Sequence, residues 1–316
     1  MSSSASYLIT PQALQASLSG EINRSSRAPV VLDVSWFMPN SPRDARSEYT
    51  KKSIPSARLL DLDELSSSHE LGLKHMMPSP EQFASTCEDF GITRDTHVIM
   101  YDSQGIFSAP RALFMFRAFG HANSSVLDGG LPRWEAEGFS TEPGSIALLS
   151  KPEKASYPTP SYDKGVVKSY DQIVANAALD PESDPSASLV VDARPNGRFT
   201  GQDPEPRPGL SAGHIPYSLS LPFTTFLETH QAPNGQSYTS FLPKDKILEA
   251  LEGKIGAKNT QDVLEGKRSI VASCGSGMTA GVLWLGLSIL GVKSPAIYDE
   301  SWTGYAMRES SKIVKD

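Results

Sequence analysis

The chain has 316 residues, of which 39% are hydrophobic and 21% charged, and it carries a formal net charge of −7. This composition is typical of a water-soluble globular protein, and a chain of this length usually forms two domains. The acidic balance, without any Lys/Arg run, argues against nucleic acid as a partner. Its longest apolar run, Ala280–Leu290, is too short to span a bilayer, so no membrane partner is predicted.

Short runs of β-branched residues predict strands in the first half of the chain, at residues 30–34, 97–102 and 125–128. The second half repeats these landmarks, at residues 189–193, 269–274 and 296–299. The offset stays near half the chain length, which indicates a duplicated domain rather than a short solenoid repeat. Because the strands alternate with helical stretches, we expect each half to form a mainly parallel sheet flanked by helices, an α/β fold.

One helix start is clear in the first half. Ser79 is suited to the N-cap, Pro80 to the first turn, and Gln82 completes a capping box. We expect this helix to stop at Gly91. Cys87 falls on the apolar stripe of the same helix, so it is predicted to be a structural residue.

Residues 142–160 are rich in Pro, Ser and Lys and lack a periodic apolar face, which is typical of a linker. We therefore predict an N-terminal domain at 1–145, a linker at 146–160 and a C-terminal domain at 161–316. Ligands of open α/β sheets bind at the carboxyl ends of the strands. Cys274 closes such a strand in the second half, where Asp102 closes its counterpart in the first, so only the second half can perform thiol chemistry.

Cys274 stands between an apolar strand and an apolar helix, and it is followed by Gly275, Ser276 and Gly277. The N–H groups of a helix's first turn favour an anion, which here would be the thiolate, the reactive form of a cysteine. The alternate glycines let the backbone curl inward around that anion. The pattern predicts a nucleophilic cysteine, because a cysteine that only packs as a small hydrophobe does not need such a loop.

These motifs resemble the two-domain rhodanese-family sulfurtransferases, and among them the 3-mercaptopyruvate branch. The active loop of that branch resembles residues 274–280, with Met278 where valine is usual. Further similar segments are residues 198–207 and 213–216 of the second half and 32–39 and 74–78 of the first. The chain departs from the family at Ser53, Ser56 and Glu300, where histidine, glycine and glycine are usual. None of these departures is expected to touch the chemistry.

The resemblance implies two tandem rhodanese-like domains and an enzyme that moves sulfane sulfur from 3-mercaptopyruvate to a thiol acceptor. Cys274 would carry the sulfur as a persulfide while pyruvate leaves. A relay of Ser276, His75 and Asp63 is implied beside it. Arg198 and Arg207 are implied to hold the donor carboxylate, which a guanidinium matches with paired donors. The other implied contacts of the donor lie in the loop: Gly275, Gly277, Met278 and Thr279.

The remaining candidates are weaker. His214 is predicted to be a structural hydrogen-bonding residue, and Trp36 is left open between lining a cleft and packing. Scattered histidines and two distant cysteines give no metal-ligand spacing, and no cofactor is expected. The expected partners are a small-molecule sulfur donor and a thiol acceptor such as thioredoxin, with a sulfur-relay protein as a further acceptor by analogy. Two cysteines favour a reducing compartment, the cytoplasm, and a serine-rich start free of acidic residues keeps the mitochondrion as an alternative.

Three other functions stay open at this point. In a thiosulfate sulfurtransferase, the family pattern places Arg and Lys after the cysteine, whereas Gly275 and Ser276 are neutral and suit the monoanionic mercaptopyruvate better. A cysteine phosphatase needs an arginine six positions after its cysteine, and position 280 is alanine. The third alternative is a non-catalytic rhodanese-like binding module, since the first half already lacks the cysteine.

Overall fold

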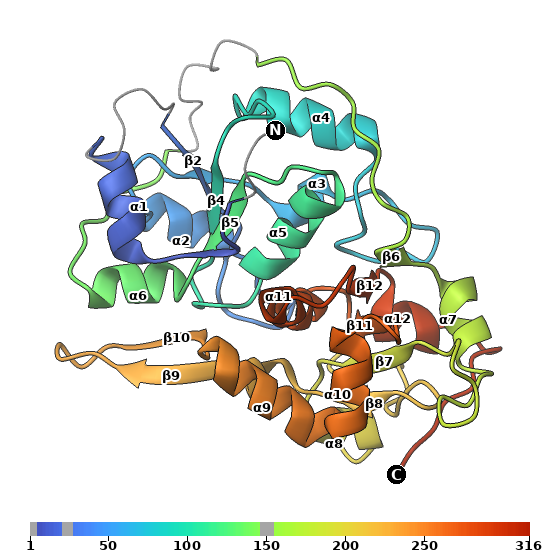
Figure 1. Ribbon diagram of the computed structural model, residues 1–316. Helices are drawn as coiled ribbons and strands as arrows, with labels where there is room; N and C mark the ends of the chain where they lie inside the picture. The colour runs from blue at the N-terminus through green and yellow to red at the C-terminus, as the bar shows by residue number, and fades with distance from the viewer. Residues whose placement is uncertain (1–4, 21–27, 146–154) are drawn as a thin grey trace. The chain divides into compact units, whose positions relative to one another are not determined.

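The computed structural model describes residues 5–20, 28–145 and 155–316 (Figure 1). The chain divides into two compact units. Unit 1 consists of Met1–Ser67, Met77–Tyr162 and Glu228–Phe241, and unit 2 of Ser68–Met76, Asp163–Leu227 and Leu242–Asp316. Residues 146–154 of the predicted linker lie outside the described residues, and the domain boundaries given above stay a prediction.

Unit 1 is built on a five-stranded sheet with the order β1-β5-β4-β2-β3, in which all neighbours run parallel. Its strands are β1 (Leu8–Ile9), β2 (Val30–Asp33), β3 (Arg58–Leu59), β4 (Val98–Tyr101) and β5 (Ser124–Leu127). Its helices are α1 (Pro11–Leu18), α2 (Ala45–Lys51), α3 (Leu62–Leu65), α4 (Pro80–Asp89), α5 (Ala109–Ala118) and α6 (Gly130–Ala136). Leu14 of α1 and Trp134 of α6 pack with Ile99 of β4 on one face, and α4 and α5 lie on the other (Figure 1).

Unit 2 repeats this topology with the order β6-β12-β11-β7-β8, again parallel throughout. Its strands are β6 (Val167–Lys168), β7 (Leu189–Asp192), β8 (Leu219–Ser220), β11 (Ile270–Ser273) and β12 (Ala296–Tyr298). Its helices are α7 (Tyr170–Asn176), α8 (Asn196–Thr200), η1 (Phe223–Phe226), α9 (Lys244–Ile255), α10 (Ala257–Leu264), α11 (Ala280–Leu290) and α12 (Ser301–Ala306). The two sheets have corresponding strands in the same order, so the duplicated α/β domain predicted from the sequence is confirmed.

Continuous β-branched sequences become the central strands because both faces of such a strand are covered by helices. Every residue of β4 and of β11 is buried. In unit 2, Val271 of β11 packs with Ile173 of α7 and Trp302 of α12, while α11 packs against β11 and α9. The ends of these central strands are therefore fixed by the core of their own unit.

The predicted capping box of α4 is confirmed. The N–H of Gln82 donates to the Ser79 hydroxyl, and the Ser79 N–H donates back to the Gln82 side chain at 2.9 Å. The helix ends at Asp89, and Gly91 follows in the left-handed region with φ of 66°. Cys87 is fully buried on this helix, and burial raises the pKa of its thiol, which agrees with a structural role.

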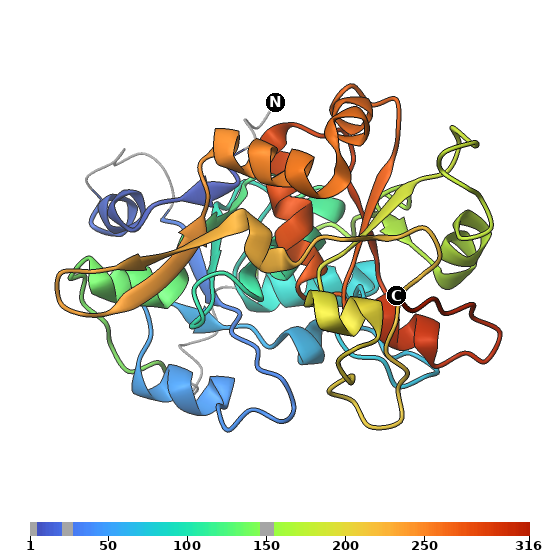
Figure 2. The same cartoon turned by 90° about the horizontal axis from the view of Figure 1, so that it is seen from below.

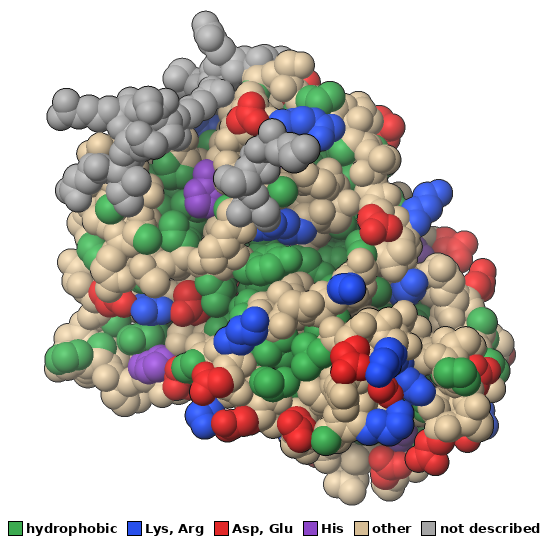
Figure 3. Space-filling model, viewed as in Figure 1, with side chains coloured by type: hydrophobic (Ala, Val, Ile, Leu, Met, Phe, Trp, Pro, Cys, Tyr) green, Lys and Arg blue, Asp and Glu red, His purple; other side chains and the backbone are tan. Residues whose placement is uncertain are grey.

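Strands β9 (Leu227–Gln231) and β10 (Ser237–Phe241) form a separate two-stranded sheet, seen from below in Figure 2. Strand β10 packs against α6 of unit 1, and the Phe241 N–H donates to the Asp128 carboxylate at 2.9 Å. On the face shown in Figure 3, basic and acidic side chains are interspersed. None of the helices formed by residues 5–20, 28–145 and 155–316 is both long and apolar enough to cross a membrane.

Candidate active site

Cys274 lies directly after β11, at the carboxyl end of the sheet of unit 2. Its Sγ accepts the N–H of Gly277 at 3.1 Å, and Gly277 adopts φ of 85°, which favours glycine. The loop therefore curls back onto the sulfur as the glycine spacing predicted. Cys274 is 1% exposed, so the loop and the residues around it cover this side chain.

The start of α12 holds the loop in this shape. The N–H groups of Trp302 and Thr303 donate to the carbonyls of Cys274 and Gly275, both at 2.9 Å. The Thr303 hydroxyl also donates to the Gly275 carbonyl at 2.6 Å, and the Cys274 N–H donates to the Ser301 hydroxyl at 3.2 Å. The carbonyls of Cys274 and Gly275 are therefore occupied by α12, which fixes the backbone of the loop.

Arg198 and Arg207 converge on Gly275. A Cβ atom at this glycine would lie 3.2 Å from Arg198 Nη2 and 3.7 Å from Arg207 Nη1. Burial lowers the pKa of the Arg207 guanidinium, and the nearby Cys274 sulfur opposes that shift. The structure thus brings both predicted arginines to the cysteine loop, where they can receive an anionic substrate.

Sequence reasoning missed a buried chain of charges behind Arg198. Asp192 ends β7 and pairs with Arg194 at 2.7 Å, and Arg194 pairs with Glu205 at 2.8 Å. Glu205 in turn pairs with Arg198 at 2.5 Å. The side chains of Asp192, Arg194 and Glu205 are at most 2% exposed. Glu205 lies in the segment 198–207 that carries part of the resemblance. Its neighbours in sequence do not indicate which charged groups its side chain faces.

A cavity of about 190 Å³ lies beside the loop within unit 2. It is lined by Leu71, Gly72, Leu73, Lys74, Arg207, Ser276, Glu300, Thr303 and Met307. Ser276 is the residue of the cysteine loop that lines this cavity. Glu300, one of the departures named from the sequence, forms part of the same wall, and its carboxylate pairs with Arg308 at 2.5 Å. That this departure does not touch the chemistry stays a prediction.

The other predicted residues are placed as follows. His75 is fully buried, has φ of 64°, and belongs to the segment Ser68–Met76 of unit 2, whose Lys74 lines the cavity. Asp63 belongs to unit 1, where its carboxylate accepts the indole N–H of Trp36 at 3.3 Å. In the loop, Met278 is 2% exposed and Thr279 is the N-cap residue of α11. The relay of Ser276, His75 and Asp63 stays a prediction.

His214 has the structural role predicted for it. Its Nδ1 lies 3.0 Å from the Phe199 carbonyl, its ring stacks on the Phe199 ring, and its backbone bridges to Val314. Trp36 packs its ring against Phe107 in addition to its bond to Asp63. Within the part of the chain that the structure describes, no three His, Cys, Asp or Glu side chains are grouped so that they could hold a metal ion.

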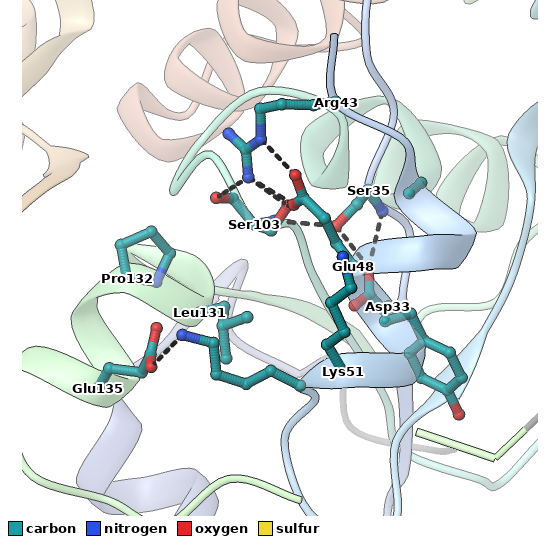
Figure 4. Close-up of a pocket in the computed structure, with 12 residues that line it drawn as sticks. Asp33, Ser35, Arg43, Glu48, Lys51, Ser103, Leu131, Pro132 and Glu135 are labelled. Atoms are coloured by element: carbon teal, nitrogen blue, oxygen red, sulfur yellow. Dashed lines mark hydrogen bonds and ion pairs between the residues drawn. The ribbon is translucent and has the colours of Figure 1, made fainter. Parts of the chain in front are cut away.

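Unit 1 has a cavity of about 290 Å³ at the corresponding strand ends (Figure 4). Ion pairs between Arg43 and Glu48 and between Lys52 and Glu135 line it. Asp33, also in its wall, is 2% exposed, and burial raises the pKa of this carboxyl to about 6. No cysteine lines this cavity.

Comparison with known proteins places these features in a family. The rhodanese-like domain family matches residues 19–137. The probable 3-mercaptopyruvate sulfurtransferase of Schizosaccharomyces pombe is 34% identical over 296 residues, which cover 93% of this chain and 92% of that protein. Thiosulfate/3-mercaptopyruvate sulfurtransferase 1, mitochondrial, of Arabidopsis thaliana is 36% identical over 299 residues, which cover 90% of this chain and 73% of that protein.

A solved structure agrees with these relatives. SseA from Escherichia coli, described as a 3-mercaptopyruvate sulfotransferase with the rhodanese fold, superimposes with a TM-score of 0.72 at 27% identity, covering 94% of this chain and 99% of that one. The chain therefore belongs to the rhodanese-like sulfurtransferases, in the group that contains the 3-mercaptopyruvate sulfurtransferases. It is an enzyme of a family that transfers sulfur.

Proposed function

We propose that this enzyme takes sulfur from 3-mercaptopyruvate onto Cys274 and passes it to a thiol acceptor. The observation that carries the proposal is the convergence of Arg198 and Arg207 on the loop whose Gly277 N–H binds the cysteine sulfur. Paired guanidinium donors fit the carboxylate and the adjacent carbonyl of a 2-oxo acid. The sulfur of a donor held in this way would lie next to the loop, within reach of the Cys274 sulfur.

In the first half-reaction, the Cys274 thiolate attacks the donor sulfur. The new S–S bond forms as the donor C–S bond breaks, and the electron pair of that bond leaves on carbon as the enolate of pyruvate. The enolate takes up a proton to give pyruvate, and the relay of Ser276, His75 and Asp63 is proposed to manage proton movement. The loop N–H groups stabilise first the thiolate and then the persulfide anion that replaces it.

In the second half-reaction, an acceptor thiolate attacks the terminal sulfur of the persulfide and the Cys274 thiolate leaves. Thioredoxin or another thiol is the proposed acceptor, and a sulfur-relay protein is a second acceptor of the same chemistry. The proposed steps need no cofactor. In each of them one sulfur atom passes to an attacking thiolate, and the leaving group keeps the electron pair of the broken bond. Thiosulfate is proposed as a poorer donor, and the name of the Arabidopsis relative includes both donors. The compartment, cytoplasm or mitochondrion, stays a prediction.

Intact-mass spectrometry after incubation with 3-mercaptopyruvate tests this function. We expect a gain of one sulfur that dithiothreitol removes and that maps to Cys274. Cys274→Ser should abolish the gain, while Cys87→Ser, which replaces the buried cysteine of α4, should retain it. A gain that maps to Cys87, or none in the wild type, contradicts the proposal. A higher kcat/KM for thiosulfate than for mercaptopyruvate contradicts the assignment of the donor.

A further inference from the structure

Glu205 holds the guanidinium of Arg198 by one edge. Its Oε1 accepts from Arg198 Nε at 3.0 Å and its Oε2 from Nη2 at 2.5 Å, while the side chain of Glu205 is 0% exposed. A bidentate contact of this kind fixes the plane of a guanidinium as well as its position. Arg198 Nη2, which keeps a second hydrogen beside the one given to Glu205, is the atom of this guanidinium that approaches Gly275, at 3.2 Å from the position of a Cβ there.

Glu205 is itself held in place by residues at the end of strand β7. Arg194 Nη1 donates to Glu205 Oε1 at 2.8 Å, and Arg194 Nη2 donates to Asp192 and to the Gly213 carbonyl, both at 2.7 Å. The guanidinium carbon of Arg194 also lies 4.3 Å from the ring centroid of Trp302, the residue whose N–H binds the Cys274 carbonyl. Because Asp192 ends β7, the direction of Arg198 is set by a rigid element rather than by its own short helix.

The same chain of residues sets the charge of the site. Asp192 and Glu205 are anionic and Arg194 and Arg198 cationic, so these four charges cancel in pairs. Beside the loop, Arg207 and Lys74 of the cavity wall add two positive charges, and the Cys274 thiolate of the proposed mechanism adds one negative charge. Glu300 in the same wall is balanced by Arg308. The resulting single positive charge matches a monoanionic donor, whereas a dianion would bring one negative charge more than the site neutralises. In a buried site, a mismatch of one charge is weakly screened and therefore costly.

We propose that Glu205 is a positioning and specificity-determining residue of the donor site. It orients Arg198 for the donor carboxylate, and its charge makes the site favour monoanionic over dianionic sulfur donors. This inference rests on the proposed function, because it takes Arg198 and Arg207 as the groups that bind the donor. It predicts that one substitution changes the use of two donors in opposite directions, which a residue that only stabilises the fold would not do.

Two substitutions separate the two roles. Glu205→Gln keeps the shape but removes the charge and one acceptor oxygen, so we expect the KM for mercaptopyruvate to rise about 10-fold, with kcat within about 3-fold, while kcat/KM for thiosulfate rises several-fold. Glu205→Asp keeps the charge on a shorter side chain. It should raise the KM for mercaptopyruvate without changing the ratio of kcat/KM between the donors.

Asp262→Asn is the matched control, because it removes one negative charge from α10 of the same unit, where Asp262 pairs with Lys258. It should leave both donors unchanged. Equal losses with both donors in Glu205→Gln, or a changed donor ratio in Glu205→Asp, would overturn the role of Glu205. A wild-type enzyme that gains no sulfur from mercaptopyruvate would instead overturn the proposed function, so the two failures are told apart by the wild type alone.

Discussion

Asp102 and Cys274 end corresponding strands, β4 and β11, and each side chain accepts backbone N–H groups from the loop that follows it. The Asp102 carboxylate accepts four of them at 2.9–3.0 Å, from Gln104, Phe107, Ser108 and Ala109. The Cys274 sulfur accepts that of Gly277. In both halves the loop therefore turns backbone N–H groups toward the side chain at the strand end, and in unit 1 that side chain is a carboxylate. A permanently filled loop has no room for a substrate anion, which explains how this half keeps the fold without the chemistry.

Asp102→Ala should destabilise the protein strongly, because it leaves four N–H groups, two buried and two partly buried, without their acceptor. We expect the free energy of unfolding to fall by about 3–5 kcal/mol, measured by urea denaturation. Asp102→Asn retains one acceptor oxygen and should lose less. A loss below about 1 kcal/mol for the alanine variant would show that the loop N–H groups find other acceptors, and would contradict the view of Asp102 as an internal anion.

Much of this architecture could be predicted because it is encoded locally. Runs such as residues 30–34 and 189–193 identify buried strands, since a strand covered on both faces needs apolar residues at every position. The capping box at Ser79 is likewise a pattern of neighbouring residues, and the glycines after Cys274 mark the loop. These features need no knowledge of distant contacts, so the strand ends and the cysteine loop follow from them.

The remaining features depend on contacts between distant residues. Nothing near Glu205 in sequence shows that it faces two arginines, because the loop that carries it could place the side chain in solvent. The grouping of segments Ser68–Met76 with unit 2 and Glu228–Phe241 with unit 1 also follows only from tertiary contacts. The place of Glu300 in the wall of the cavity beside Ser276 likewise follows only from the fold. Tertiary contacts therefore determine which charges pair and which residues line a cavity.

The buried Asp33 carboxyl should make stability fall as pH rises through the weakly acidic range. Burial raises its pKa to about 6 from an ordinary value of 3.8, so the folded protein binds more protons than the unfolded chain between about pH 4 and pH 6. Protonated Asp33 therefore favours folding at low pH, and that contribution is lost as pH rises. At about 1.4 kcal/mol per pH unit, the loss totals roughly 3 kcal/mol.

Asp33→Asn removes this titration while other groups stay the same. The difference in unfolding free energy between wild type and Asp33→Asn, measured by urea denaturation at several pH values, should change by roughly 3 kcal/mol between pH 4 and pH 7, in favour of the variant at high pH. Parallel curves for the two proteins would show that Asp33 has the same affinity for protons in both states.

Two glycines in helices of unit 2 should respond to alanine in opposite ways. A Cβ atom at Gly286 in α11 would lie 2.4 Å from the ring of Phe226, which is fully buried. Gly286→Ala should therefore overpack the core and cost about 1–3 kcal/mol of unfolding free energy. At Gly253 in α9, apart from the adjacent residues and the backbone of the helix itself, no heavy atom lies within 4 Å of such a Cβ, so Gly253→Ala should stabilise the helix by about 0.5–1 kcal/mol. Thermal denaturation of both variants decides the matter, and a stabilising Gly286→Ala would contradict the packing described for η1 and α11.

Gly275→Ala should weaken donor binding while leaving the fold intact. The added methyl would lie 3.2 Å from Arg198 Nη2, and Arg198 cannot easily retreat because the buried Glu205 carboxylate binds both its Nε and its Nη2. We expect the KM for mercaptopyruvate to rise about 10-fold, with the unfolding free energy within about 1 kcal/mol of wild type. A double-mutant cycle with Arg198→Ala tests the cause: once the guanidinium is gone, the methyl has nothing to displace, and Gly275→Ala should add little to the loss already produced by Arg198→Ala. Fully additive losses would mean that the methyl acts through the loop backbone, and the glycine would then be required for the curl around the sulfur rather than for the approach of the arginine.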